Sequence, residues 1–392
     1  MLRKTIMLSV SVLLAVCVGC QSHVQNKKAA KERWDKASAQ IKLALAQQQY
    51  DNGKYEEATK AIQECISADP ENPVSRVLYG KLLLASGRCS EAKEQLSFAL
   101  KSEEKLHDGW YWLGVAEQES RNYQKAYECY NKALLLEPAK VDYILAVADA
   151  QVAMGDCVGA LKLLSEKETT MPREVSLKVA AADLMFRQGD TEEAIKLYEE
   201  AALLAEDSGI AESLGYSYIL DKRWERAAEV FEGLVAQCKD PERSKLLLRQ
   251  LAVCNMNAKR YDKALSCYSK LVVEERENAR FWLKMGEAAL GTGAETKALM
   301  CGQKALALQP GYPDAIALVG CAQYAGGDYT AAAETFGKIT SVETHSGFAW
   351  LIRARCYERL GQKNNAEDAY KKALEMNPKS ELANLLVKDM KR

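Results

Sequence analysis

Apolar residues through most of the chain recur three and four positions apart, the spacing that gathers side chains on one face of an α-helix. Short polar breaks, many of them ending in glycine, interrupt this pattern at regular intervals. Glycine is the residue that most readily ends a helix in a tight turn. The pattern therefore predicts an all-α chain, a long series of short amphipathic helices joined by tight turns.

The helical pattern also repeats along the chain. Residues 110–138 read W-x2-L-G followed by Y-x2-A-x3-Y-x2-A-x4-P, which resembles the tetratricopeptide repeat, a pair of antiparallel helices in about 34 residues. The resemblance implies an α-solenoid, a right-handed superhelix of about ten helix-turn-helix repeats over residues 39–380. In this frame the repeats start at Ala39, Pro73, His107, Val141, Val175, Ser208, Lys245, Ala279, Pro313 and Gly347.

Two positions test the frame, because neighbouring helices approach closely only where side chains are small. The second helix has alanine at one such position in every copy: Ala58, Ala92, Ala126, Ala160, Ala194, Ala227, Ala264, Ala298, Ala332 and Ala366. The eighth position of the first helix is alanine or glycine in every copy: Ala46, Gly80, Gly114, Ala148, Ala182, Gly215, Ala252, Gly286, Gly320 and Ala354.

The joints between copies are regular except around the sixth. The alanines of the second helices are 34 residues apart, but 33 and then 37 residues apart there. The change predicts an altered joint between Glu206 and Lys245, where the solenoid either bends or presents a longer loop at Gln237–Arg243. Dipeptides that end in glycine predict the turns inside six repeats, at Asn52-Gly53, Ser86-Gly87, Met154-Gly155, Gln188-Gly189, Gly326-Gly327 and Leu360-Gly361.

Prolines are expected to stop half of the second helices, because proline cannot continue a helix. They are Pro70, Pro138, Pro172, Pro310 and Pro378. The last segment, 381–392, carries leucines at helical spacing and predicts a C-terminal helix that caps the tenth repeat.

The first twenty residues follow a different pattern. Arg3 and Lys4 precede an uncharged run from Thr5 to Gly19, which is the build of a secretory signal peptide and is too short for a membrane-spanning helix. Its end, Cys17-Val18-Gly19-Cys20, resembles a bacterial lipobox, which implies that Cys20 is lipidated and becomes the N-terminus. Cys17 stands where lipoboxes usually have leucine, so an ordinary signal peptide or an uncleaved membrane stub is the alternative.

Residues 21–38 are polar and predict a short tether between the lipid and the first repeat. Gln21 follows the cysteine, and in the enterobacterial sorting pattern a residue other than aspartate there directs a lipoprotein to the outer membrane. The resemblance therefore implies attachment to the membrane through an N-terminal lipid, in the cell envelope and on the periplasmic face of the outer membrane. The choice between inner and outer membrane stays open.

The chain offers little chemistry for catalysis. Its three histidines, His23, His107 and His345, lie far apart in the sequence, and no H-E-x-x-H, G-x-S-x-G or phosphate-binding glycine motif occurs. Outside the segment Cys17–Cys20 there is no C-x-x-C pair, so no zinc site is expected. The sequence predicts a protein that is not an enzyme and has no cofactor and no small-molecule substrate.

Ten further cysteines lie at scattered positions in the repeats, where they are expected to fill space between helices. Cys254 and Cys267 lie almost symmetrically about the turn of the seventh repeat, so a disulfide between them is the one bridge left open.

Nucleic acid is not an expected partner. Cleavage at Cys20 removes two of the 53 basic residues, which leaves 51 against 54 acidic residues and no basic stripe for phosphates.

Partner proteins or peptides are expected to bind along the first helices. Frame positions 2, 5, 9 and 12 lie on one face at helical spacing. In proteins that resemble this one, that face lines the concave groove that holds peptides. Here it is largely apolar, and acidic from the third to the sixth repeat. The groove residues that we expect are Tyr111, Val115, Gln118, Asp142, Leu145, Asp149, Val179, Asp183, Phe186, Glu212, Tyr216, Arg249, Arg280 and Tyr324.

The resemblance implies a lipid-anchored scaffold for other envelope proteins, of the kind that aids assembly of secretion, pilus, outer-membrane or polysaccharide-export complexes. The alternative is a non-catalytic accessory or carbohydrate-binding subunit of an envelope enzyme system. That alternative needs clustered surface aromatics, and Trp110 and Trp112 are the only close tryptophan pair.

Overall fold

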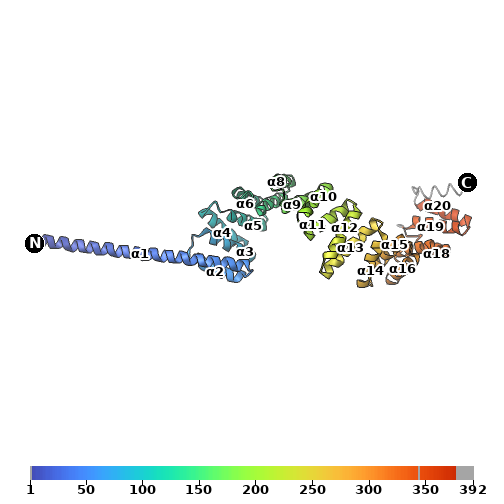
Figure 1. The fold of residues 1–392 in the computed structure, drawn as a ribbon, viewed down its shortest axis with the longest axis horizontal. Helices are drawn as coiled ribbons and strands as arrows, with labels where there is room; N and C mark the ends of the chain where they lie inside the picture. The colour runs from blue at the N-terminus through green and yellow to red at the C-terminus, as the bar shows by residue number, and fades with distance from the viewer. Residues whose placement is uncertain (1, 343–344, 377–392) are drawn as a thin grey trace. The chain divides into compact units, whose positions relative to one another are not determined.

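The computed structural model describes residues 2–342 and 345–376, with side chains for residues 27–342, 345 and 347–376. The expected capping helix 381–392, Pro378 and the side chain of Cys20 lie outside these residues. All regular structure in the described part of the chain is helical (Figure 1). The expectation of an all-α solenoid built from helical hairpins is confirmed.

The helices follow one another in ten pairs. In the first five repeats they are α1 (Leu2–Asp51), α2 (Tyr55–Ala68), α3 (Pro73–Ala85), α4 (Cys89–Ser102), α5 (His107–Glu119), α6 (Tyr123–Leu136), α7 (Val141–Ala153), α8 (Cys157–Thr170), α9 (Val175–Gln188) and α10 (Thr191–Leu204). In the last five they are α11 (Ser208–Leu220), α12 (Trp224–Gln237), α13 (Pro241–Asn257), α14 (Tyr261–Glu274), α15 (Ala279–Gly291), α16 (Glu295–Leu308), α17 (Pro313–Ala325), α18 (Tyr329–Gly337), α19 (Ser346–Arg359) and α20 (Lys363–Met376).

The predicted starts of the repeats agree closely with the observed starts of the first helices. In seven repeats, the second to sixth, the eighth and the ninth, the first helix begins at the predicted residue. Local chemistry fixes several of these starts. The side chain of Asn72 accepts a hydrogen bond from the backbone of Ser75, and Asp207 accepts two in the same way. Such caps satisfy N–H groups that have no partner inside the helix.

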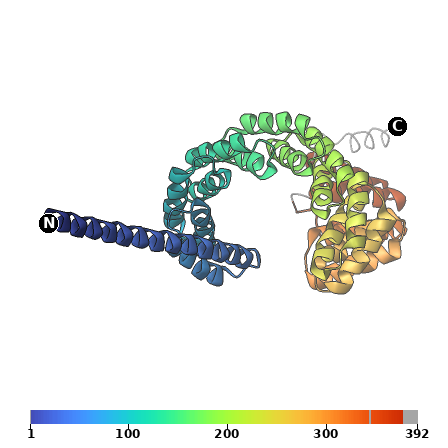
Figure 2. The ribbon, with the colours of Figure 1, turned by 60° about the vertical axis from the view of Figure 1, so that its left-hand side comes forward.

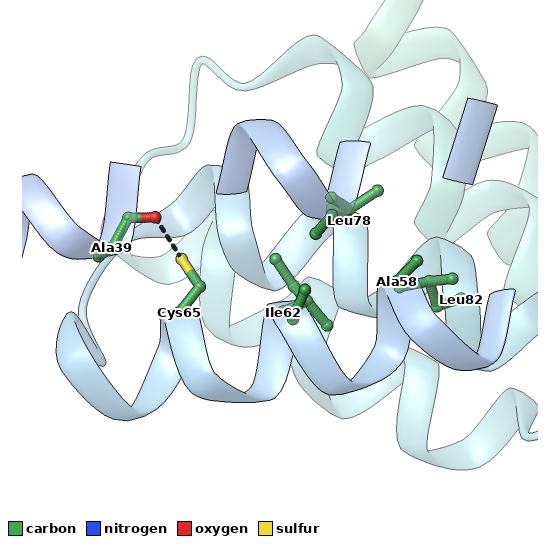
Figure 3. Close-up of a cluster of buried hydrophobic side chains, with 8 residues drawn as sticks. Ala39, Ala58, Ile62, Cys65, Leu78 and Leu82 are labelled. Carbon is green, nitrogen blue, oxygen red and sulfur yellow. Dashed lines mark hydrogen bonds between the residues drawn. The ribbon is translucent and has the colours of Figure 1, made fainter. Parts of the chain in front are cut away.

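The crowded positions of the frame are buried as predicted. All ten alanines of the second helices have no exposed surface. At the eighth position of the first helix, a Cβ added to Gly320 would come within 2.6 Å of the Phe336 ring in the same repeat. Figure 3 shows the same kind of packing in the first repeats, where Ala58, Ile62 and Leu82 belong to one buried cluster.

The turn inside each repeat contains one residue in the left-handed region. Seven of the ten are glycines, and all six predicted glycine turns are among them. In the third, sixth and seventh repeats the residue is Arg121, Lys222 or Lys259, with φ between 57° and 59°. Side chains with a Cβ are strained there, since the left-handed conformation costs them roughly 1 to 2 kcal/mol.

Of the two alternatives for the altered joint, the longer loop at Gln237–Arg243 is wrong. Helix α12 ends at Gln237 and α13 already begins at Pro241, so the extra residues lengthen the helix to 17 residues. The cause is local, because Asp240 accepts a hydrogen bond from the backbone of Glu242, and Pro241 fits the first turn of a helix.

The cysteines of the repeats are free thiols in the structure, and Cys254 and Cys267 are among them. Both are buried, on α13 and α14. Burial raises the pKa of the Cys254 thiol to about 12, since a charged thiolate is poorly solvated there. Their surroundings agree with the prediction that cysteines fill space between helices.

The chain divides into two compact units, Met1–Leu184 and Met185–Arg392. In the first unit α3 contacts α5, and in the second unit α15 contacts α17. In these pairs the first helices of neighbouring repeats are therefore adjacent. In Figure 2 the helices of the first unit follow one another as the colour runs from blue to green. The predicted groove residues all lie on these first helices.

Candidate partner-binding groove

Six of the predicted groove residues line one pocket of about 290 Å³ in the first unit. Helix α5 contributes Tyr111, Val115 and Gln118, and helix α7 contributes Asp142, Leu145 and Asp149. The remaining lining residues are Glu119, Tyr130 and Ala146. The stripe of frame positions 2, 5, 9 and 12 thus forms a hollow where the third and fourth repeats meet. We refer to it as the α5–α7 pocket.

Aromatic rings hold Tyr111 in this pocket. Its ring is stacked on Tyr143 at a centroid distance of 4.9 Å, and it meets Trp112 edge-on at 5.4 Å. Tyr130 lies 5.6 Å away and donates a hydrogen bond of 3.0 Å to Gln118. Stacked and edge-on rings prefer these distances. Tyr111 therefore occupies a fixed position and does not swing freely in solvent.

Carboxylates surround the apolar part of the pocket. Asp142 and Asp149 are exposed on α7, seven residues apart, and so about 10 Å apart along one side of the helix. Burial raises the pKa of the Tyr111 phenol, and the negative charges of Asp142, Asp108 and Asp149 raise it further.

A charged network that the sequence did not predict lies beside the pocket. Asp108 accepts a hydrogen bond of 2.8 Å from Tyr143, and it accepts bonds from Lys81 at 3.2 Å and Lys140 at 3.3 Å. His107 joins the network, because its Nδ1 lies 2.7 Å from the Tyr143 oxygen. Asp108 and Lys81 lie on the predicted stripe, whereas Tyr143 and Lys140 do not, and no motif within one repeat reveals that they meet.

The network fixes the charge of Asp108. Burial raises the pKa of this carboxyl, but the hydrogen bond from Tyr143 and the positive charges of Lys81 and Lys140 outweigh burial and hold the pKa at about 2. Asp108 is therefore ionised at neutral pH and is neutralised by its own lysines. It supports Tyr143, on which Tyr111 is stacked.

The other predicted groove residues do not line this pocket. Val179 and Asp183 are half-buried on α9 in the first unit, and Phe186 lies on the same helix in the second unit. In the second unit Glu212 forms an ion pair with Arg243 at 2.9 Å, which compensates its charge. Tyr216 meets Phe231 edge-on at 5.5 Å.

Arg249, Arg280 and Tyr324 are the last of the predicted residues. Arg249 is paired with Glu275, which also binds Lys245 at 2.8 Å. Hydrogen bonds from Lys245, Asn278 and Arg249 hold the pKa of Glu275 at about 2. Arg280 lines a separate, wide pocket of about 980 Å³ that includes residues 273–280, and Tyr324 meets Tyr329 edge-on at 5.3 Å.

Trp110 and Trp112 are both engaged within the chain. The Trp110 indole donates a hydrogen bond of 2.8 Å to the carbonyl of Glu104, and the amine of Lys132 lies 4.0 Å from its ring centre. Trp112 meets Tyr111, and the amine of Lys81 lies 5.1 Å from its ring centre. A lysine of the same chain therefore lies over each of the two rings.

Within the residues that the structure describes, no group of three or more His, Cys, Asp or Glu side chains is arranged to hold a metal ion. None of the helices in that part of the chain combines the length and the apolarity that are needed to cross a bilayer.

Four family models match the sequence. Three describe tetratricopeptide repeats and match residues 49–105, 107–140 and 179–240. The fourth describes the middle TPR-like domain of cilia and flagella-associated protein 70 and matches residues 248–375. The matches fall on the repeats that the frame defines, in both units.

Curated relatives are distant and much longer than this chain. The auxiliary subunit NAA15 of the N-terminal acetyltransferase A complex of Arabidopsis thaliana is 23% identical over 150 residues, which is 38% of this chain and 17% of that protein. General transcription factor 3C polypeptide 3 of Homo sapiens is 24% identical over 377 residues, or 86% of this chain and 42% of that protein. The chain thus spans less than half the length of either relative.

Among solved structures, PilF of Pseudomonas aeruginosa is similar to 55% of this chain and is covered over 99% of its own length, with 14% identity and a TM-score of 0.46. The three repeat models match the repeats of the frame, whose ten second-helix alanines are buried. The chain therefore contains tetratricopeptide repeats.

Proposed function

We propose that this protein is a lipid-anchored scaffold of the cell envelope, and that its α5–α7 pocket binds a segment of a partner protein. The observation that carries the proposal is the convergence of six predicted groove residues on that one pocket. They combine a fixed aromatic ring, aliphatic side chains and two exposed carboxylates, which is the composition of a peptide-binding surface.

The chemistry of the pocket indicates what the segment carries. Val115 and Leu145 offer apolar surface, so the segment presents an aliphatic or aromatic side chain. Asp142 and Asp149 stand on the same side of α7 and favour a lysine or arginine next to it. Exposed carboxylates mainly increase the rate of association, and their attraction for a cation weakens as salt screens it. Apolar contacts instead slow the release of the bound segment.

The lipid anchor is a separate part of the proposal and rests on the sequence Cys17-Val18-Gly19-Cys20. A lipidated Cys20 would hold the repeats at a membrane, where assembly of secretion, pilus or polysaccharide-export complexes takes place. Two or more acyl chains are needed for stable attachment. Cys20→Ala should move the protein from the detergent phase to the aqueous phase, and unchanged partitioning would remove the anchor from the proposal.

Site-specific photocrosslinking in the native host tests the pocket. A photoreactive amino acid at Leu145 should capture a partner that the same amino acid at Lys162, which is exposed on α8, does not capture. Asp142→Lys together with Asp149→Lys should reduce capture and flatten its dependence on salt.

Glu128→Lys with Glu166→Lys makes the same charge change at exposed positions of the second helices α6 and α8, and serves as the control. If both pairs reduce capture equally, or if Leu145 and Lys162 give the same products, partner binding does not involve the pocket.

A further inference from the structure

The first helix presents an apolar stripe that no part of the described chain covers. Trp34 is 74% exposed, Ile41 is 73% exposed and Leu45 is 46% exposed. They are seven and four residues apart, and a turn of about 100° per residue places all three within roughly 40° of one direction. The opposite side of α1 is the one that packs on α2, through Ala39 and Ala46.

In the next three repeats, the side of the first helix that corresponds to this stripe is covered by a neighbouring helix. Ile41 is the third residue of its repeat, and in the next three repeats that position holds Ser75, Gly109 and Tyr143, all of which are buried. There the same side of the first helix packs on the second helix of the preceding repeat, as Leu78 and Leu82 of α3 pack with Ile62 of α2 (Figure 3). Repeat 1 has the same surface without that helix.

The stripe also continues beyond the repeat, toward the N-terminus. Ala30, Trp34, Ala37, Ile41, Ala44 and Gln48 follow one another at steps of four and three residues. This is the spacing of a surface against which a second helix packs, and the alanines that alternate with the larger residues of the stripe leave holes for its side chains. A helix that lies flat on a membrane instead needs a broad face of bulky apolar residues, so the small residues favour a helix as the occupant.

The charges beside the stripe indicate the chemistry of that helix. Residues 27–36 hold five basic residues, Lys27, Lys28, Lys31, Arg33 and Lys36, and only two acidic ones, Glu32 and Asp35. Lys27 and Lys31 stand closest to the stripe, since both lie within about 60° of Trp34 on the helix. Two copies of this basic stretch side by side would repel each other, whereas an acidic helix would be attracted.

We propose that the Trp34–Ile41–Leu45 stripe is a second docking surface, which binds an acidic amphipathic helix of a partner protein in the place of a preceding second helix. This surface is distinct from the α5–α7 pocket and does not require the lipid. It lets the scaffold bind two partners at once, one through its groove and one through its first helix.

A peptide with the sequence of residues 190–206 is a suitable probe, because this segment is a second helix with six acidic residues and one lysine. Labelled with a fluorophore, it should bind the full-length protein and shift the emission of Trp34. Trp34→Gln with Ile41→Gln should weaken binding at least tenfold, while Gln40→Ala with Gln47→Ala, on an exposed side of α1 away from the stripe, should leave it unchanged. All four side chains are exposed, so the folds should stay intact. A variant of this peptide in which its glutamates are replaced by lysine should bind at least tenfold more weakly than the original peptide.

Three results would overturn the proposal. The first is that the wild-type protein and the Gln variant bind the peptide equally or not at all. The second is that brominated lipid vesicles quench Trp34, as judged against Trp34→Phe, and that the peptide does not compete, which would assign the stripe to a membrane. The third is a dimer in sedimentation that Trp34→Gln with Ile41→Gln dissociates, which would assign the stripe to a second copy of the chain.

Discussion

The phenol of Tyr143 on α7 donates a hydrogen bond of 2.8 Å to the carboxylate of Asp108 on α5, and so joins two successive repeats. Tyr143 is buried, and Tyr111 of the pocket is stacked on it. Tyr143→Phe keeps the aromatic ring but removes one hydrogen-bond donor from Asp108. The free energy of unfolding should therefore fall by about 1 to 3 kcal/mol. Hydrogen exchange of the α5 and α7 amides should increase while that of α17 stays unchanged. Equal exchange in both proteins would show that the hydrogen bond does not stabilise the joint.

The same pair predicts a dependence on acid. The pKa of Asp108 is about 2 in the folded chain, below the ordinary value of 3.8. A group whose folded pKa is lowered contributes stability above its unfolded pKa and loses it as the pH falls through the folded value. The contribution of Asp108 should therefore be complete above about pH 4 and disappear toward pH 2. In Asp108→Asn, exchange of the α5 amides should vary less over this interval than in the wild type, and an identical pH profile would contradict the assignment.

Two glycines on helices of the second unit should respond oppositely to the same substitution. In Gly320→Ala the new Cβ would lie 2.6 Å from the buried Phe336 ring, and overpacking of this kind costs about 1 to 3 kcal/mol. In Gly233→Ala the Cβ meets nothing within 4 Å, and alanine should stabilise α12 by up to about 1 kcal/mol. Urea unfolding of both variants measures the difference. Shifts of the same sign would mean that the frame does not describe the packing.

The strained turns offer a route to higher stability. Lys259 has φ of 57°, a conformation that glycine adopts without strain. Lys259→Gly should therefore stabilise the seventh repeat by roughly 0.5 to 1 kcal/mol, after allowing for the extra freedom of glycine in the unfolded chain. The reverse change, Gly293→Lys at the equivalent turn of the eighth repeat, should destabilise by a similar amount. Thermal unfolding compares the two, and a loss of stability in Lys259→Gly would contradict the strain argument.

The thiols should differ in reactivity according to burial. Cys254 and Cys301 have no exposed surface, and burial raises the pKa of both thiols, to about 12 and about 11. Alkylating agents react with the thiolate, so these two should be modified only on unfolding, after the partly exposed Cys89 and Cys157. Mass spectrometry of the protein isolated without reductant also tests a Cys254–Cys267 disulfide. Rapid labelling of Cys254 in the folded protein would contradict the burial.

The repeat frame could be read from the sequence because it depends on the sizes of a few residues at fixed spacing. Ala126 and its equivalents are small wherever two helices must touch, and the structure buries them all. The pairing of Asp108 with Tyr143 could not be predicted in this way, because the two residues belong to different repeats. They come into contact only after the α5–α6 hairpin has folded and α7 has packed beside it. The sequence predicts a groove face that is acidic from the third to the sixth repeat and includes Glu212, but Arg243 of the lengthened α13 neutralises this carboxylate. That lengthening depended on the capping residue Asp240, which the repeat spacing alone does not reveal.

The continuity of α1 has a mechanical consequence. From Lys27 to Asp51 the chain is one helix whose last turns belong to the first repeat. A continuous helix is rigid, unlike a flexible linker. Each residue added or removed before Ala39 would therefore rotate the upstream part of the chain by about 100° about the helix axis and shift it by about 1.5 Å along that axis. The number of residues in this segment, and not only their polarity, therefore sets the direction in which the first repeat faces.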